Sequence, residues 1–142
     1  MIDQLTVFLE NKEGHLASMC RCLGDAGVNM VALTIAESSE YGLVRILCTE
    51  PERAAKVLDD AGYRATVSPV MAIGLPDRPG SLADLLDTFD GLGFNVEYGY
   101  CFLTRDGRAA DVFKVGGAAA SAEVTFKLEE AGFKVLSWED IA

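Results

Sequence analysis

Hydrophobic residues in the first half of the chain follow two kinds of pattern. Short apolar runs rich in β-branched residues predict four strands, at residues 5–9, 28–36, 43–48 and 63–67. Between them, hydrophobic residues recur every three or four positions and predict two helices, at residues 15–26 and 52–61. Gly27 and Gly62 directly follow these helices and suit the left-handed conformation that commonly ends a helix. The predicted order of elements is therefore βαββαβ.

The second half of the chain repeats this order. The same patterns predict strands at residues 70–75, 95–103, 109–115 and 134–138, and helices at residues 81–92 and roughly 120–131. At an offset of 66 residues, six of the 32 positions in residues 7–38 are identical to their counterparts. The identical pairs are Leu9/Leu75, Gly14/Gly80, Leu16/Leu82, Ala17/Ala83, Gly27/Gly93 and Asn29/Asn95. They keep the same order relative to the predicted elements, so we interpret the chain as two repeated units, residues 1–68 and 69–142.

A βαββαβ unit folds as a four-stranded antiparallel sheet with two helices on one face. We therefore predict an α+β protein made of two ferredoxin-like units. Three of the predicted strands are apolar on both faces, at residues 31–36, 43–48 and 98–103. A sheet with one face in water normally alternates apolar and polar residues. We therefore expect the second face to be covered as well, by another copy of the chain in a homodimer.

The connection between the two units predicts a particular exchange of strands. Only Ser68 and Pro69 separate the strand at 63–67 from the strand at 70–75. The first and last strands of a ferredoxin-like unit are antiparallel neighbours, so a two-residue turn would seat residues 63–67 in the second sheet. The C-terminal strand at 134–138 would then complete the first sheet. We hypothesise this exchange of fourth strands.

Two corresponding loops, ENKEGHLA at residues 10–17 and PDRPGSLA at residues 76–83, each lead from a strand into a helix. The free N–H groups and the dipole at a helix start favour an anion such as a carboxylate. Asn29 and Asn95 begin the strand after each helix, and an Asn side chain suits both the ammonium and the carboxylate of an α-amino acid. Alternatively, these Asn residues and the loop residues Asn11 and Asp77 merely cap a helix or bond a turn.

The segments ENKEGHLASMCRCLGDAGVNM and LPDRPGSLADLLDTFDGLGFNV resemble the opening of the ACT domain, a regulatory module with βαββαβ topology. The second loop, with Asp-Arg-Pro-Gly at 77–80, is closer to the family pattern, whereas Glu13 stands where proline is usual. The resemblance implies binding of an amino acid or similar small ligand. It also implies units that pair side by side through their second strands as a continuous sheet, with the ligand at the junction. The ligand-binding residues that it implies are Asn11, Glu13, Gly14, His15, Asn29, Asp77, Pro79, Gly80, Ser81 and Asn95.

The overall charge narrows the range of partners. The chain has 22 acidic and 12 basic residues among its 142, a formal net charge of −10. Binding to nucleic acid or to an anionic membrane surface needs a positive patch, so we expect neither. No apolar run approaches the roughly 20 residues of a membrane span, and no signal peptide is recognisable. We therefore expect a cytoplasmic protein.

The residues do not favour an enzyme or a metal protein. His15 is the sole histidine, and neither Cys20 nor Cys22 stands at a spacing that makes a dependable Cys–His pair. The two cysteines lie two apart on a predicted helix, so they point about 200° apart and cannot hold one ion. No phosphate-binding glycine loop ends in Lys-Ser or Lys-Thr. We expect no catalytic residue, no metal and no cofactor.

The most economical interpretation is a non-catalytic regulatory protein that binds an amino acid and changes its own association or the activity of a separate enzyme. Two alternatives remain at this point. One is a structural dimerisation module without a ligand, and the other is a metal-binding ferredoxin-like protein. The sequence does not name the amino acid, the regulated target or the direction of regulation.

Overall fold

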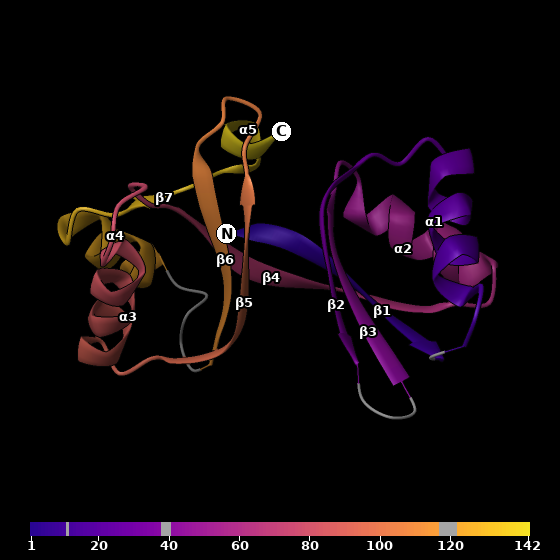
Figure 1. The fold of residues 1–142 in the computed structure, drawn as a ribbon, viewed down its shortest axis with the longest axis horizontal. Coiled ribbons are helices and arrows are strands. Elements are labelled where there is room, and N and C mark those ends of the chain that lie inside the picture. The colour runs from indigo at the N-terminus through magenta and orange to yellow at the C-terminus, as the bar shows by residue number, and fades with distance from the viewer. Residues whose placement is uncertain (11, 38–40, 117–121) are drawn as a thin grey trace. The chain divides into compact units, whose positions relative to one another are not determined.

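The computed structural model describes residues 1–10, 12–37, 41–116 and 122–142. It divides into two compact units, one formed by residues 3–68 and the other by residues 69–142 together with Met1 and Ile2 (Figure 1). Among the helices in these ranges, none is long and apolar enough to cross a membrane.

The first unit is a four-stranded antiparallel sheet with two helices on one face (Figure 1). Its elements are β1 (Ile2–Glu10), α1 (His15–Asp25), β2 (Met30–Glu37), β3 (Tyr41–Cys48), α2 (Pro51–Asp60) and the beginning of β4 (Arg64–Gly74). The strands lie in the order β2-β3-β1-β4. Alternate residues of β1 face the helices, and the core they form includes Leu5, Val7, Leu9, Met19, Leu23, Val44, Ile46 and Leu58.

The second unit has the same architecture. Its elements are the end of β4, α3 (Ser81–Gly91), β5 (Asn95–Leu103), β6 (Ala109–Gly116), α4 (Ala122–Glu130), β7 (Lys134–Val135) and α5 (Trp138–Ile141). Ile73 of β4 pairs with Asp111 of β6 and with Val135 of β7, so these strands flank β4 on opposite sides. Because β5 pairs with β6, the order is β5-β6-β4-β7, which matches that of the first unit. The core includes Met71, Leu85, Phe89, Phe113, Val124 and Leu128.

The predicted fold class is confirmed, since both units are α+β sheets built in the βαββαβ order. The helix starts predicted at His15 and Ser81 are those observed. The glycines expected to end helices, Gly27 and Gly62, have φ values of 74° and 90°. Only residues that tolerate positive φ fit there, and glycine does so without strain.

The predicted exchange of fourth strands is wrong. Ser68 and Pro69 do not form a turn, because β4 continues without interruption from Arg64 to Gly74. The first part of β4 stays in the first unit, where Ala65 and Val67 pack against the core. β7 pairs with Gly74 and Ile73 in the second unit, and Val135 packs against that unit's core. A proline that reads as a break in the sequence lies here within a strand that passes from one unit to the other.

The C-terminal segment also differs from the prediction. Instead of a strand over residues 134–138, a two-residue strand is followed by the short helix α5. A capping box begins this helix, because the Ser137 N–H and hydroxyl donate to the carboxylate of Asp140 over 2.9 and 3.1 Å. The Ser-x-x-Asp spacing was visible in the sequence and would have predicted the helix start.

Part of the second sheet's other face is covered by the chain itself. Met71 and Ile73 face the helices, so Ala72 and Gly74 face away from them. The Leu136 N–H donates to the Ala72 carbonyl over 2.7 Å, and the Leu136 side chain lies directly over Gly74. The C-terminal segment therefore crosses this face. Coverage by another copy of the chain stays a prediction.

Candidate functional site

The two strand-to-helix loops have the same backbone geometry. Gly14 and Gly80 occupy the N-cap positions of α1 and α3 with φ values of 84° and 89°. A β-carbon at either glycine would meet no atom of the described residues within 4 Å, so the left-handed backbone, rather than crowding, calls for glycine. The sequence repeat therefore corresponds to a repeated local structure.

Hydrogen bonds within the loops repeat as well. In the second loop, the Arg78 N–H donates to the Pro76 carbonyl over 3.0 Å and the Ser81 N–H to the Arg78 carbonyl over 3.3 Å. The first loop has the equivalent bonds, from Lys12 to Glu10 and from His15 to Lys12. Among the residues that the structure describes, no side chain caps either helix start. The N–H groups of the first turn thus stay available to an anion, which the helix dipole also favours.

Ser81 distinguishes the second loop from the first. Its side chain is 5% exposed, and its Oγ has no hydrogen-bond partner among the described residues. A buried polar atom without a partner costs about 1–3 kcal/mol. The corresponding residue, His15, is partly exposed. Only the second loop therefore places an unsatisfied buried hydroxyl beside an uncapped helix start.

The remaining loop residues are exposed and differ in charge. Asp77 and Pro79 lie at the surface, as does Glu13 in the first loop. Arg78 forms an ion pair with Asp84, with 3.4 Å between Nη2 and Oδ2. In the first unit, a hydrogen bond from Lys12 holds the pKa of the Glu10 carboxyl below its usual value, and the Lys12 charge adds to this effect. Asn11 lies outside the described residues.

Asn95 lies far from the second loop within its own unit. The loop leaves β4 after Gly74, which pairs with Ala110, and Ala110 pairs with Phe102 near the end of β5. Asn95 is seven residues away along β5, where it pairs with Gly116. That separation is roughly 24 Å of strand. One small ligand cannot contact both elements of a single unit.

The first unit has the same separation. Its loop follows the end of β1, where Leu9 pairs with Gly42 and Gly42 with Glu37. Asn29 precedes Met30, which pairs with Cys48 at the other end of the sheet. The structure therefore brings together residues 76–81, and separately residues 12–15, but neither asparagine joins the loop of its own unit.

The cysteines give no metal site in the described part of the chain. No group of three or more His, Cys, Asp or Glu side chains gathers there in a way that could hold an ion. Cys48 is buried and Cys101 is exposed, and burial raises the pKa of the Cys48 thiol. A raised thiol pKa lowers the fraction of thiolate, which is the form that binds metals and reacts as a nucleophile.

Comparison with known proteins identifies the class. The family model described as the ACT domain pair matches residues 1–133. The chain therefore belongs to the ACT domain pair family, whose units are regulatory.

Solved structures agree with this assignment. A protein from Bacteroides thetaiotaomicron is 30% identical, with a TM-score of 0.87, over 98% of this chain and 94% of that one. The ligand-free regulatory subunit of aspartate kinase from Thermus thermophilus is 15% identical, with a TM-score of 0.65, over 91% of both chains. At that identity, the second likeness shows the fold alone.

A curated protein shares sequence with about half of the chain. Over 74 residues, the chain is 35% identical to a GTP pyrophosphokinase from Myxococcus xanthus. The match covers 52% of this chain and 10% of that protein. The chain thus spans about a tenth of the length of this relative.

Proposed function

We propose that the chain is a non-catalytic regulatory protein that binds an amino acid at the loop of residues 76–81. The observation that carries the proposal is Ser81, whose buried Oγ lacks a partner among the described residues and lies at an uncapped helix start. A ligand carboxylate would accept hydrogen bonds from this hydroxyl and from the first N–H groups of α3. Asp77 is exposed beside the loop and would attract the ligand's ammonium group.

The other residues take lesser parts in this proposal. Pro79 and Gly80 set the backbone conformation of the loop. Asn95 would contact a ligand at this loop only if it came from another ACT unit, because it lies far from the loop of its own unit. The first loop, with Glu13, Gly14, His15 and Asn29, would form a weaker site because its described residues include no buried unsatisfied group equivalent to Ser81. The regulated partner would be an enzyme, as the names of the aspartate kinase regulatory subunits suggest for those proteins. A ligand shifts such a regulatory equilibrium only by its differential affinity for the two states.

The first experiment is a thermal-shift screen of the twenty amino acids. A binder at 100 times its Kd should stabilise the folded chain by about 2.7 kcal/mol. Ser81→Ala should then lower the affinity of that binder about tenfold, because a hydrogen bond to a charged group is lost. The unliganded variant should be as stable as the parent or more so, because the unsatisfied hydroxyl is gone.

Ser18→Ala is the matched control, since Ser18 is exposed on α1 of the other unit and should leave affinity unchanged. Isothermal titration calorimetry measures the affinities and denaturant unfolding measures the stabilities. Unchanged affinity in Ser81→Ala would show that the ligand does not bind at this loop.

Self-association is a second part of the proposal, and it rests on β2. This strand lies at the end of the first unit's strand order, where its outer backbone groups have no neighbouring strand in that unit. Leu33 and Ile35 are 40% and 49% exposed on it. A long apolar edge strand is a template for pairing with another chain. We propose that β2 pairs with β2 of a second copy in a homodimer.

Ile35→Lys should convert the dimer to a monomer, because each copy would place a charge in the apolar edge that pairs. Phe126→Lys places the same charge at an exposed position of α4, so the molar mass measured in solution should remain that of the dimer. Light scattering after size-exclusion chromatography gives the mass. A dimer that survives Ile35→Lys excludes β2 as the contact.

A further inference from the structure

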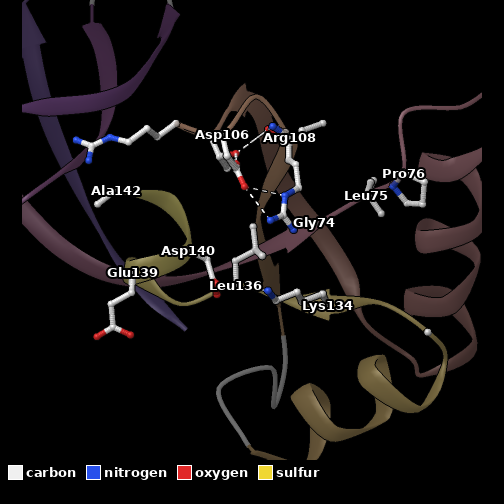
Figure 2. Close-up of a pocket in the computed structure, with 14 residues that line it drawn as sticks. Gly74, Leu75, Pro76, Asp106, Arg108, Lys134, Leu136, Glu139, Asp140 and Ala142 are labelled. Carbon is white, nitrogen blue, oxygen red and sulfur yellow. Dashed lines mark hydrogen bonds and ion pairs between the residues drawn. The ribbon is translucent and has the colours of Figure 1, made fainter.

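The second unit contains a pocket of about 680 Å3 that includes none of the ten expected binding residues. Its walls are the end of β4 with Leu75 and Pro76 at the beginning of the following loop, the turn between β5 and β6, and the segment from β7 to α5 (Figure 2). Ligand pockets typically measure about 300–1,000 Å3, so this one is large enough for a small molecule. Gly74 and Leu136 lie at its base, and charged side chains surround them.

The turn between β5 and β6 is held rigidly. The Thr104 N–H donates to the Arg108 carbonyl over 2.8 Å, and the Thr104 hydroxyl donates to Asp106 Oδ1. Asp106 Oδ2 accepts from both Nε and Nη2 of Arg108 over 2.8 Å (Figure 2). These bonds, from Thr104 first and then from Arg108, hold the pKa of the Asp106 carboxyl below its usual value. The remaining N–H groups of Arg108 can therefore bind a ligand without rearrangement of the turn.

The opposite wall is similarly ordered. Ser137 donates its N–H and its hydroxyl to Asp140 Oδ2, and both bonds lower the pKa of the Asp140 carboxyl. Lys134 Nζ lies 3.4 Å from Asp140 Oδ1. Each wall thus contributes an ion pair, Arg108 with Asp106 on one side and Lys134 with Asp140 on the other.

Two further charges at the pocket have no ion-pair or hydrogen-bond partner in the described residues, the cation of Arg105 and the anion of Glu139. With Arg108 and Lys134 against Asp106 and Asp140, the lining holds three positive and three negative side chains. We propose that this pocket is a second ligand site that takes a zwitterion, a small molecule with one carboxylate and one ammonium group. An amino acid or a dipeptide has this chemistry.

The balance of charge decides between ligand classes. A simple anion would meet Asp106, Asp140 and Glu139 as well as the cations, in a chain whose net charge is −10. A polyamine would be repelled by Arg105, Arg108 and Lys134 at close range. A zwitterion pairs both unpartnered charges at once, with its carboxylate towards Arg105 and its ammonium towards Glu139. Of these three ligand classes, it alone brings an opposite charge to both exposed side chains.

The test uses the full chain and NMR. The probes are the twenty amino acids and glycylglycine, each titrated into 15N-labelled protein. At least one probe should shift the amide signals of Gly107, Arg108 and Lys134 in a saturable way. Capping the same probe as its N-acetyl or its amide form should abolish the shifts, because one of its charges is then missing. The proposal fails if no probe moves these signals, or if a capped probe binds equally well.

Variants separate this site from the loop site. Arg105→Gln with Glu139→Gln should weaken binding at the pocket about tenfold or more. The matched control, Arg21→Gln with Glu52→Gln, removes the same charges from exposed positions in the first unit and should change nothing. Ser81→Ala should also leave pocket binding intact. If Ser81→Ala abolishes binding and the pocket variant retains it, the ligand binds at the loop and the pocket proposal fails. If the pocket variant loses binding and Ser81→Ala retains it, the ligand binds in the pocket.

Discussion

Replacing Phe89 with alanine is expected to lower the free energy of unfolding of the second unit by about 3–5 kcal/mol. Phe89 is 1% exposed on α3, and its ring meets that of Phe113 edge to face, with centroids 5.7 Å apart and an interplanar angle of 71°. The substitution removes apolar surface from the core and leaves a cavity between α3 and the sheet. The aromatic pair adds about 0.5–1.5 kcal/mol beyond the buried area.

Trp138, the single tryptophan of the chain, reports on this unit in denaturant unfolding followed by fluorescence. Phe126→Ala is the control, because Phe126 is 61% exposed on α4 and its loss should change stability by no more than about 0.5 kcal/mol. Equal effects of the two substitutions would mean that α3 is not packed on the sheet as described.

Gly99→Ala is expected to destabilise the same unit by about 1–3 kcal/mol, although it adds just one methyl group. A β-carbon at Gly99 would lie 2.6 Å from Cδ1 and 2.7 Å from Cε1 of Phe113. It would also lie 3.1 Å from the Val112 carbonyl oxygen. The Phe113 ring cannot move away freely, because it packs against Phe89. The strain must therefore be taken up by β5 or by the core.

Gly91→Ala provides the contrasting control. Gly91 ends α3 with no positive φ, and a β-carbon there meets nothing within 4 Å. Alanine restricts the unfolded chain and suits a helix, so this variant should be more stable by about 0.4–1 kcal/mol. Chemical unfolding of both variants should give changes of opposite sign. A stabilised Gly99→Ala variant would contradict the close approach of β5 to Phe113.

Local structure in this chain could be predicted because its determinants are local. The left-handed backbone at Gly14 and Gly80 and the helix starts that follow were visible as a repeated glycine before an apolar periodic run. Gly27 and Gly93, the helix-ending glycines of the repeat, likewise have φ values of 74° and 78°. A residue's own conformational preference determines each of these features, so the sequence pattern was sufficient.

The pairing of strands could not be predicted in the same way. The periodicity of residues 63–67 shows a strand but not which sheet receives it. That choice depends on where Ala65 and Val67 find apolar surface, and they find it against the core of the first unit. The expected two-residue turn at Ser68 and Pro69 rested on topology alone, and the extended backbone there overrides it.

The candidate sites likewise combine features that depend on local sequence with features that depend on tertiary packing. The open helix start at Gly80 follows from the sequence, whereas the burial of the Ser81 hydroxyl depends on tertiary packing. Asn95 follows α3 closely in sequence, yet the register of β5 carries it to the other end of the sheet from the loop. The pocket depends on the C-terminal segment crossing the sheet at Leu136. No hydrophobic periodicity in the sequence predicts that path.

The uninterrupted course of β4 affects how the chain can be dissected. A cut between residues 68 and 69 falls inside the uninterrupted strand β4, so a protease meets extended strand there rather than an irregular linker. The fragment that begins at residue 69 would also lack Met1 and Ile2, which belong to its unit. Dividing the chain between these two residues would therefore interrupt β4. It would also leave Met1 and Ile2 in a different fragment from the rest of their unit. We therefore expect the two units to stay together when genes recombine.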